Sequence, residues 1–322
     1  MWAAVVMALM VGWPAAMEAE EGEQEVWTVA VMADLNGAYG STDYNEHVHG
    51  AVQWVIEEGE VDGVVIAGDL VAGQMEGLGY EAMWEAFHEV VTRPLMEADI
   101  PVAVTPGNHD GSERPRFWRE RAEFVRQWER YRPKVSMIDD RHYPFYYAFE
   151  LGPAVFLSLD GTGVGKLDEA HIHWLMSNPG SDHEGPVFVM SHLPQYPVAQ
   201  GREREVFDDP RLEEALDGVE VVISGHHHAF YPAKVGESLY LNAGALGSGV
   251  RPLLGESEVG ERVMTVLRFD AQGLVAMEGR VGPDFGEVLD LESLPERLEL
   301  PSQRRLDREV LERAPALEVA PE

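Results

Sequence analysis

Side chains that bind divalent metal ions recur along the first two thirds of this chain, each directly after a short apolar run. They are Asp34, Asn36, Asp69, Asn108, His192, His226 and His228. Imidazoles with a few carboxylate and amide oxygens suit zinc, iron or manganese, and a pair of metals needs one carboxylate that reaches both. Asp69 is the natural candidate for that bridge. The chain has no Cys, which excludes a structural zinc site built on thiolates.

The apolar runs that precede these side chains have the composition of buried strands. They cover residues 29–32, 64–67, 102–105, 187–190 and 221–224, are rich in Val and Ile, and end in Gly or a polar residue. In open α/β sheets, ligands collect at the carboxyl ends of the strands, so residues far apart in sequence can converge there. The sequence therefore predicts a metal site at the carboxyl ends of these strands.

The segments between and after these runs predict an alternation of strands and helices. Helical patterns cover 48–58, 80–98, 115–130 and 167–177, and further strand patterns cover 263–269 and 274–281. This alternation indicates an α/β architecture. One large catalytic domain fits better than two, because the candidate ligands extend from Asp34 to His228 and strand patterns continue beyond them.

The residues of these blocks resemble the sequence motifs of one protein family. The blocks are Asp34-Leu35-Asn36, Gly68-Asp69, Gly107-Asn108-His109-Asp110, Ser191-His192 and Gly225-His226-His227-His228. In this order they resemble the D-x-H, GD, GNH[DE], H and GHxH pattern of calcineurin-like metallophosphoesterases, over roughly Trp27 to Val281. The resemblance implies two packed β-sheets flanked by helices, in four αββα layers. It also implies hydrolysis of a phosphomonoester or phosphodiester by a hydroxide that bridges two divalent metals.

The resemblance also implies a role for each residue of the site. One metal would take Asp34, Asp69 and His228, and the other Asp69, Asn108, His192 and His226. His109 would stabilise the developing charge or protonate the leaving oxygen, and Asp110 is the candidate to orient its ring.

The first block departs from the family pattern, because Asn36 stands where the family has His. An amide oxygen is a poorer donor than imidazole for zinc or iron, but it can bind a hard cation or a metal-bound water. We expect Asn36 to face the site, since residues two apart on a strand leave it in similar directions.

The net charge of −33, with only three Lys among 24 basic residues, argues against nucleic acid as a partner. The same charge repels small anionic substrates unless metals or arginines focus the field locally. An arginine-rich segment at 114–132 could contact an anionic substrate. The favoured interpretation is a solvated helix whose arginines pair with Glu113, Glu120, Glu123 and Glu129.

Residues 1–17 predict a signal peptide, because an uncharged apolar core at 2–13 precedes a small-residue region and is too short to span a bilayer. We expect export to the periplasm or the medium, with an N-terminally anchored form as the alternative and no integral membrane domain. The metallophosphoesterase domain is expected at 26–282. An acidic tail containing Pro, Leu and Arg follows at 283–322, with helix near 301–313. The sequence carries no signal for an oligomeric state.

Three functions compete at this stage. The five blocks favour a secreted dinuclear phosphoesterase acting on a phosphate ester. The departure at Asn36 also allows a turnover-deficient envelope protein that binds metal or phosphate, although His109 and Asp110 argue against it. An envelope structural protein with an incidental fold predicts no tightly bound metal. The leaving group stays open among nucleotides, sugar phosphates, phospholipid head groups and phosphoproteins.

Overall fold

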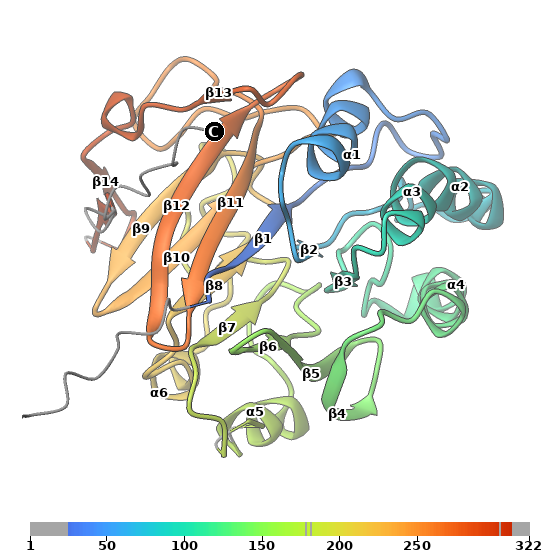
Figure 1. The fold of residues 1–322 in the computed structure, drawn as a ribbon, viewed down its shortest axis with the longest axis horizontal. Helices are drawn as coiled ribbons and strands as arrows, with labels where there is room; N and C mark the ends of the chain where they lie inside the picture. Colours follow the sequence, from blue (N-terminus) through green and yellow to red (C-terminus); the bar gives the residue numbers. More distant parts are fainter. Residues whose placement is uncertain (1–24, 178, 181, 303, 311–322) are drawn as a thin grey trace, which may run out of the picture.

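The computed structural model describes residues 25–177, 179–180, 182–302 and 304–310, and two β-sheets dominate its ribbon (Figure 1). The smaller sheet has six strands in the order β13-β12-β11-β1-β2-β3. Their bounds are β1 Trp27–Met32, β2 Gly63–Ile66, β3 Val102–Val104, β11 Val263–Asp270, β12 Gly273–Val281 and β13 Glu287–Val288.

The larger sheet has nine strands in the order β14-β15-β9-β10-β8-β7-β6-β5-β4. Their bounds are β4 Ser136–His142, β5 Tyr146–Leu151, β6 Ala154–Ser158, β7 Val187–Met190, β8 Val221–Ser224, β9 Phe230–Val235, β10 Ser238–Ala243, β14 Arg297–Glu299 and β15 Arg305–Arg308. All five strands predicted to lead into the metal site are present.

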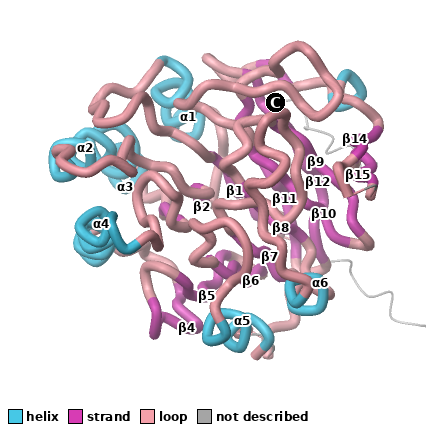
Figure 2. The backbone as a smooth tube through the Cα atoms, turned by 180° about the vertical axis from the view of Figure 1, so that it is seen from behind, coloured by secondary structure: helices cyan, strands magenta, loops and turns pink. Residues whose placement is uncertain are grey.

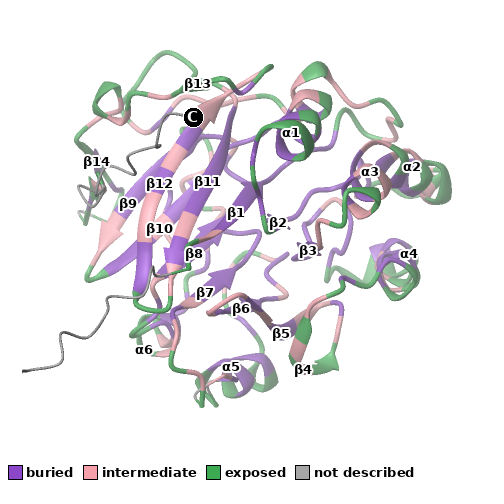
Figure 3. Cartoon of the chain, viewed as in Figure 1, coloured by how far each residue is buried: buried purple, intermediate pink, exposed green. Residues whose placement is uncertain are grey.

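The two faces of β1 show how the layers are built. Val29 and Val31 pack into a core shared with the inner face of the larger sheet. Ala30 and Met32 point the other way, into a core shared with helices. Successive side chains of a strand point to opposite faces, so a strand that is apolar at every position must be covered on both sides. Figure 3 shows β1, β7 and β8 mostly buried.

The helices form the two outer layers. On the smaller sheet lie α1 Glu46–Glu57, α2 Tyr80–Phe87, α3 Arg93–Glu97 and α4 Trp118–Arg130, and on the larger sheet α5 Glu169–Met176 and α6 Arg211–Ala215. A π-helical turn at His88–Thr92 joins α2 to α3, and single turns of 3₁₀ helix lie at Pro115–Phe117 and Leu291–Ser293. Figure 2 shows both groups of helices from behind. The predicted α/β fold with four αββα layers is confirmed.

Two helix starts differ from the predicted bounds for a local reason. The Asn45 side chain accepts hydrogen bonds from His47 N and Val48 N, so α1 begins at Glu46. The Asp168 side chain accepts from His171 N, so α5 begins at Glu169. Short polar side chains at this position satisfy backbone amides that the first helical turn leaves free.

The described part of the predicted tail after residue 282 adds strands to both sheets. Strand β13 pairs with β12, and β15 pairs with both β14 and β9. Leu306 is buried between the exposed Arg305 and Asp307, which is the period of a strand. Over the described residues, the helix expected near 301–313 is therefore wrong.

The predicted signal peptide at 1–17 lies outside the described residues. Among the helices of the described segments, none has the length and apolar character needed to cross a membrane.

Candidate metal centre

The residues that follow five strands of the two sheets meet at one point. Two groups of ligand atoms form there, Asp69 with His192 and His226, and Asp34 with Asp69 and His228. Within each group all ligand atoms lie within 4.8 Å of one another. Asp69 belongs to both groups, so its carboxylate occupies the position that a bridge between two cations requires.

The backbone is strained at four of these residues. The φ angles are +53° at Asp34, +56° at Asp69, +64° at His226 and +54° at His228. These values lie in the left-handed region, which residues other than Gly rarely adopt. Each such residue costs on the order of 1–3 kcal/mol, and such strain gathers at functional sites, where the surrounding structure maintains it. Four of the five residues in the two ligand groups are therefore strained, and His192 is the exception.

Two glycines of the sequence blocks allow the loops to approach closely. A Cβ atom at Gly107 would lie 2.0 Å from Asp69 N, and one at Gly225 would lie 2.6 Å from Asp34 Oδ2. Any side chain at either position would push the loops apart. His226 N donates a hydrogen bond of 2.9 Å to Asp34 Oδ2, which joins the loop after β8 to the loop after β1.

Outer hydrogen bonds fix which nitrogen of each histidine faces the cluster. His192 Nδ1 lies 2.8 Å from the Ala67 carbonyl, and His228 Nδ1 lies 2.9 Å from the Gly249 carbonyl. His226 Nε2 lies 2.9 Å from Glu205 Oε2. Because an oxygen acceptor there requires N–H, the opposite nitrogen of each ring carries the lone pair whenever the ring is neutral, as metal binding requires. This outer support is typical of metal-binding histidines.

The inner atoms of the cluster are rich in electron pairs and poor in donors. His226 Nδ1 lies 3.2 Å from His192 Nε2, which lies 3.3 Å from Asp69 Oδ2. Asp34 Oδ1 is buried and makes no hydrogen bond of normal geometry, although His228 Nε2 lies 3.2 Å away. Facing lone pairs and an unsatisfied carboxylate oxygen are unfavourable unless a positive charge lies among them. The donor set therefore fits divalent cations.

The electrostatics of the free side chains agree with that fit. Burial alone would lower the pKa of His192, but the adjacent Asp69 carboxylate outweighs it and raises the pKa to about 9. Burial would raise the pKa of Asp69, but His192 and His109 hold it well below its usual range. The cluster therefore draws a proton to itself, and a bound cation would take the place of that positive charge.

The Asn-His block lies beside the cluster. Asn108 Oδ1 is 3.0 Å from His192 Nε2, and Asn108 Nδ2 donates to Gln74 Oε1 at 3.1 Å, so its oxygen faces the cluster. His109 N donates to Asp69 Oδ1 at 2.8 Å. The His109 ring, half-buried, has Nδ1 3.0 Å from the Gly73 carbonyl. The structure thus brings Asn108 to His192 and His109 to Asp69.

Asp110 does not orient the ring of His109, contrary to the prediction. Its two oxygens accept hydrogen bonds from Leu70 N at 2.5 Å and Gly107 N at 2.6 Å. Burial and the Asp69 charge raise the pKa of Asp110 to about 7. Asp110 therefore ties together the loops that follow β2 and β3, and the Gly73 carbonyl orients the ring instead.

Asn36 is buried and its backbone N donates to the Asp69 carbonyl at 3.1 Å. Its side-chain oxygen accepts a hydrogen bond of 2.6 Å from the Ser248 hydroxyl. Ser248 therefore uses one of the two acceptor positions of the amide oxygen. A direct contact between Asn36 and a metal stays a prediction.

Several residues around the cluster were not found by sequence reasoning. Glu205, Arg202 and Gln74 lie in loops, where no spacing pattern marks them. Glu120 was expected to pair with arginines on the surface of a helix, but it is fully buried, and its Oε2 accepts from Gln74 N at 2.5 Å. Burial raises the pKa of Glu120 to about 8. Its burial beneath a loop became visible only in the folded chain.

The ion pairs favoured from the sequence for the arginine-rich segment are present in part. Arg121 forms an ion pair with Asp160 and lies over the ring of Phe145 at 3.6 Å. Arg126 pairs with Glu123 one helical turn away.

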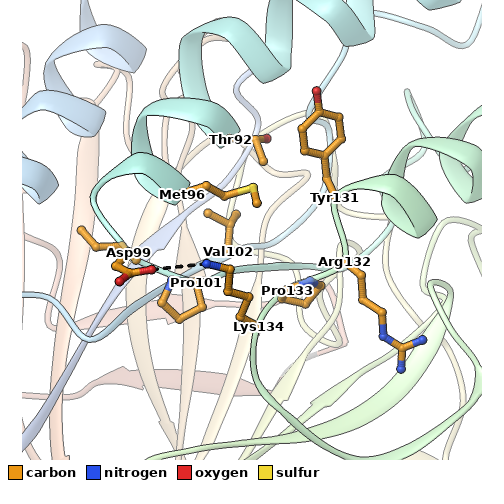
Figure 4. Close-up of a pocket in the computed structure, with 10 residues that line it drawn as sticks. Thr92, Met96, Asp99, Pro101, Val102, Tyr131, Arg132, Pro133 and Lys134 are labelled. Atoms are coloured by element: carbon orange, nitrogen blue, oxygen red, sulfur yellow. Dashed lines mark hydrogen bonds and ion pairs between the residues drawn. The ribbon is translucent and has the colours of Figure 1, made fainter.

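A small cavity of about 40 Å³ lies away from the cluster (Figure 4). Val102, at the start of β3, lines it, and the ion pair of Lys134 Nζ with Asp99 Oδ1 at 3.3 Å lies beside it. The candidate ligand Asn108 follows the other end of that strand. The cavity is too small for a phosphate ester and has no part in the site.

Comparison of the sequence with protein families assigns the chain to a family of enzymes. The model of the calcineurin-like phosphoesterase family matches residues 28–230, which is more than half of the chain. The chain therefore belongs to the calcineurin-like phosphoesterase family, as the sequence blocks predicted, and its class is that of the metallophosphoesterases, which are phosphoric ester hydrolases. Among curated proteins, none matches its sequence.

Solved structures share the fold at low sequence identity. A dimetal phosphatase from Danio rerio is 16% identical over 82% of this chain and 98% of that chain, with a TM-score of 0.55. GAP50, described as the anchor in the inner membrane complex of Plasmodium, is 16% identical over 88% of this chain and 90% of its own, with a TM-score of 0.54. PhoD is 14% identical over 82% of this chain and 68% of its own, with a TM-score of 0.55. At these identities the similarity shows the fold alone.

Proposed function

We propose that this chain hydrolyses a phosphomonoester or phosphodiester at two divalent cations held by the cluster. The observation that carries the proposal is that Asp69 belongs to two ligand groups at once. One cation would be held by Asp34, Asp69 and His228, with Asn36 as a further ligand or as the partner of a bound water. The other would be held by Asp69, Asn108, His192 and His226. The donors suit manganese, iron or zinc.

Two cations held there would activate a water molecule and neutralise charge on the phosphate. His109 is the group of the chain placed to handle the leaving oxygen. With Nδ1–H donating to the Gly73 carbonyl, its Nε2 is the ring nitrogen left to exchange a proton with the leaving oxygen. Its backbone N–H on Asp69 ties the position of the ring to the shared carboxylate.

Two observations favour a second candidate, a protein that binds metal or phosphate without turnover. Asn36 replaces the His of the family pattern, and GAP50 shows that a chain with this fold can be described as an anchor. Against this candidate, His109 is present beside the cluster and bonded to Asp69. The two candidates differ in turnover but not in metal binding.

The test uses metal-stripped protein reloaded separately with Mn, Zn, Fe and Mg, and measures hydrolysis of an aryl phosphomonoester and an aryl phosphodiester. We expect turnover to return with at least one metal and to be lost in Asp69→Asn. Asp217→Asn is the matched control, because this carboxylate is exposed on a loop. Tight metal binding without turnover on any substrate would reject the hydrolase and leave the binding protein. Absence of tight metal would reject both.

Export is a separate proposal, supported by the pattern at residues 1–17. N-terminal sequencing of the protein from its native cells tests it: a mature chain that begins near residue 18 supports cleavage. An intact N-terminus in the membrane fraction supports the anchored alternative.

A further inference from the structure

Two arginines lie at the edge of the metal cluster, beside His226 and His228. Arg202 Nη1 is 3.2 Å from His226 Nε2, on the side of the ring away from the cluster. The backbone N of Arg251 donates a hydrogen bond of 2.9 Å to the His228 carbonyl. Each arginine thus lies beside one of the two histidines of the last sequence block.

The backbone brings the two arginines together. The segments that carry them run antiparallel, with a bridge between Ala199 and Leu253 and a hydrogen bond of 3.0 Å from Gln200 N to the Pro252 carbonyl. A Cβ atom at Gly201 would lie 3.9 Å from Arg251 Nη1, so the Arg251 guanidinium lies against the residue that precedes Arg202. The pair is therefore held by paired backbone.

The two guanidinium groups differ in how their charge is balanced. Arg202 forms an ion pair with Glu205, whose carboxylate also bonds His226. Arg251 makes no ion pair within the described residues, and its Nε is buried without a hydrogen-bond partner. Partial burial lowers the pKa of Arg251, and the nearby positive charge of Arg202 lowers it further, while the Glu205 carboxylate offsets part of the shift. Two neighbouring guanidinium groups that share one carboxylate keep a net positive charge, which favours binding of a further anion.

We propose that Arg202 and Arg251 bind a second anionic group of the substrate, a phosphate or carboxylate close to the phosphate that is hydrolysed. A guanidinium presents a planar fork of donors that matches both kinds of anion. The site would then select phosphate esters of acidic molecules over phosphate esters of neutral alcohols. In a chain of net charge −33, such a local positive patch also offsets repulsion of the substrate. This inference rests on the proposed function.

The test compares ω-carboxyalkyl phosphates of increasing length with the alkyl phosphates of the same length, using metal-loaded protein. We expect the wild type to prefer the carboxylated member at one or more lengths by about 10- to 100-fold in kcat/KM, the size of one or two charge-assisted hydrogen bonds. Arg251→Gln should lower kcat/KM for the carboxylated esters by that factor more than for the alkyl esters. Arg251→Lys keeps the charge and should retain part of the preference.

Arg204→Gln is the matched control, because Arg204 lies on the loop of Arg202 but lines a separate pocket with Tyr196. It should retain the full preference. Equal preference of the wild type for both series at every length would overturn the inference, as would an equal loss on both series in a folded Arg251→Gln protein. If no ester is hydrolysed, the proposed function fails. Calorimetric binding of the same pairs of esters then decides the anion site by itself.

Discussion

The contact between Glu205 and His226 leads to a prediction about metal affinity. The hydrogen bond from His226 holds the pKa of Glu205 at about 2, so at neutral pH this partner of the ring is a carboxylate. Its position 2.9 Å from His226 Nε2 directs the opposite nitrogen toward His192. Glu205→Gln keeps the size of the side chain but removes the charge that polarises the ring.

The magnitude follows from the exposure of the pair. Losing an outer partner of a metal-binding histidine typically costs 10- to 100-fold in metal affinity, or about 1.4–2.7 kcal/mol. The Glu205 side chain is 39% exposed and solvent screens its charge, so we expect the lower part of that range, about 10- to 30-fold. The loss should affect only the cation held by His192 and His226.

The assay is competition between the protein and a chromophoric chelator for Mn or Zn, which resolves two affinities in the wild type. Glu203→Gln is the control, because Glu203 lies on the same loop and bonds only Gly201 N among the described residues. Unchanged affinities in Glu205→Gln, or the same loss in the control, would refute the reasoning that the carboxylate acts through His226.

Three further predictions address other parts of the fold. Asn36→His should tighten the weaker of the two metals about tenfold or more, since imidazole is the better donor for zinc or iron; a metal titration without any change would remove Asn36 from the direct ligands. Glu120→Ala leaves the buried Gln74 N–H without its acceptor, so urea denaturation should show a loss of about 1–3 kcal/mol, while the exposed Glu129→Ala on the same helix should stay within about 0.5 kcal/mol. Burial lowers the pKa of His88 from the ordinary 6.5 to about 3. Between these two pH values the unfolded chain binds a proton that the folded chain does not. The free energy of unfolding should therefore fall as pH drops from about 6.5 toward 3, by at most about 1.4 kcal/mol per pH unit. The free energy of unfolding of wild type minus that of His88→Gln should therefore decrease over this range, and a constant difference would show that His88 is not held neutral.

The metal cluster was predictable because its residues directly follow strands. A strand predicted from a short run of Val and Ile ends where the run ends, so local sequence places its last side chain. Parallel strands of one sheet end at a common edge, which gathers three blocks on the smaller sheet and two on the larger. The packing of the two sheets then brings these two groups together. Local patterns also located α1 and α5, whose starts each differ from the prediction by two residues because of capping side chains.

The contacts around the cluster were not predictable in this way. Asp110 follows His109 in sequence, yet burial turns its oxygens to the amides of Leu70 and Gly107. Strand β15 has too few alternating residues to be separated from a helix by pattern, and pairing with β9 decides its form.

The sequence by itself therefore determined the fold class, the family and the residues that gather at the strand ends, since these depend on local patterns repeated along the chain. Only the tertiary structure decided which nitrogen of each histidine faces the cluster, that Glu205 supports His226, and that Arg202 and Arg251 lie together. Those features depend on contacts between loops that are distant in sequence. The packing of the two sheets sets the positions of these loops, and no single segment of the sequence determines them.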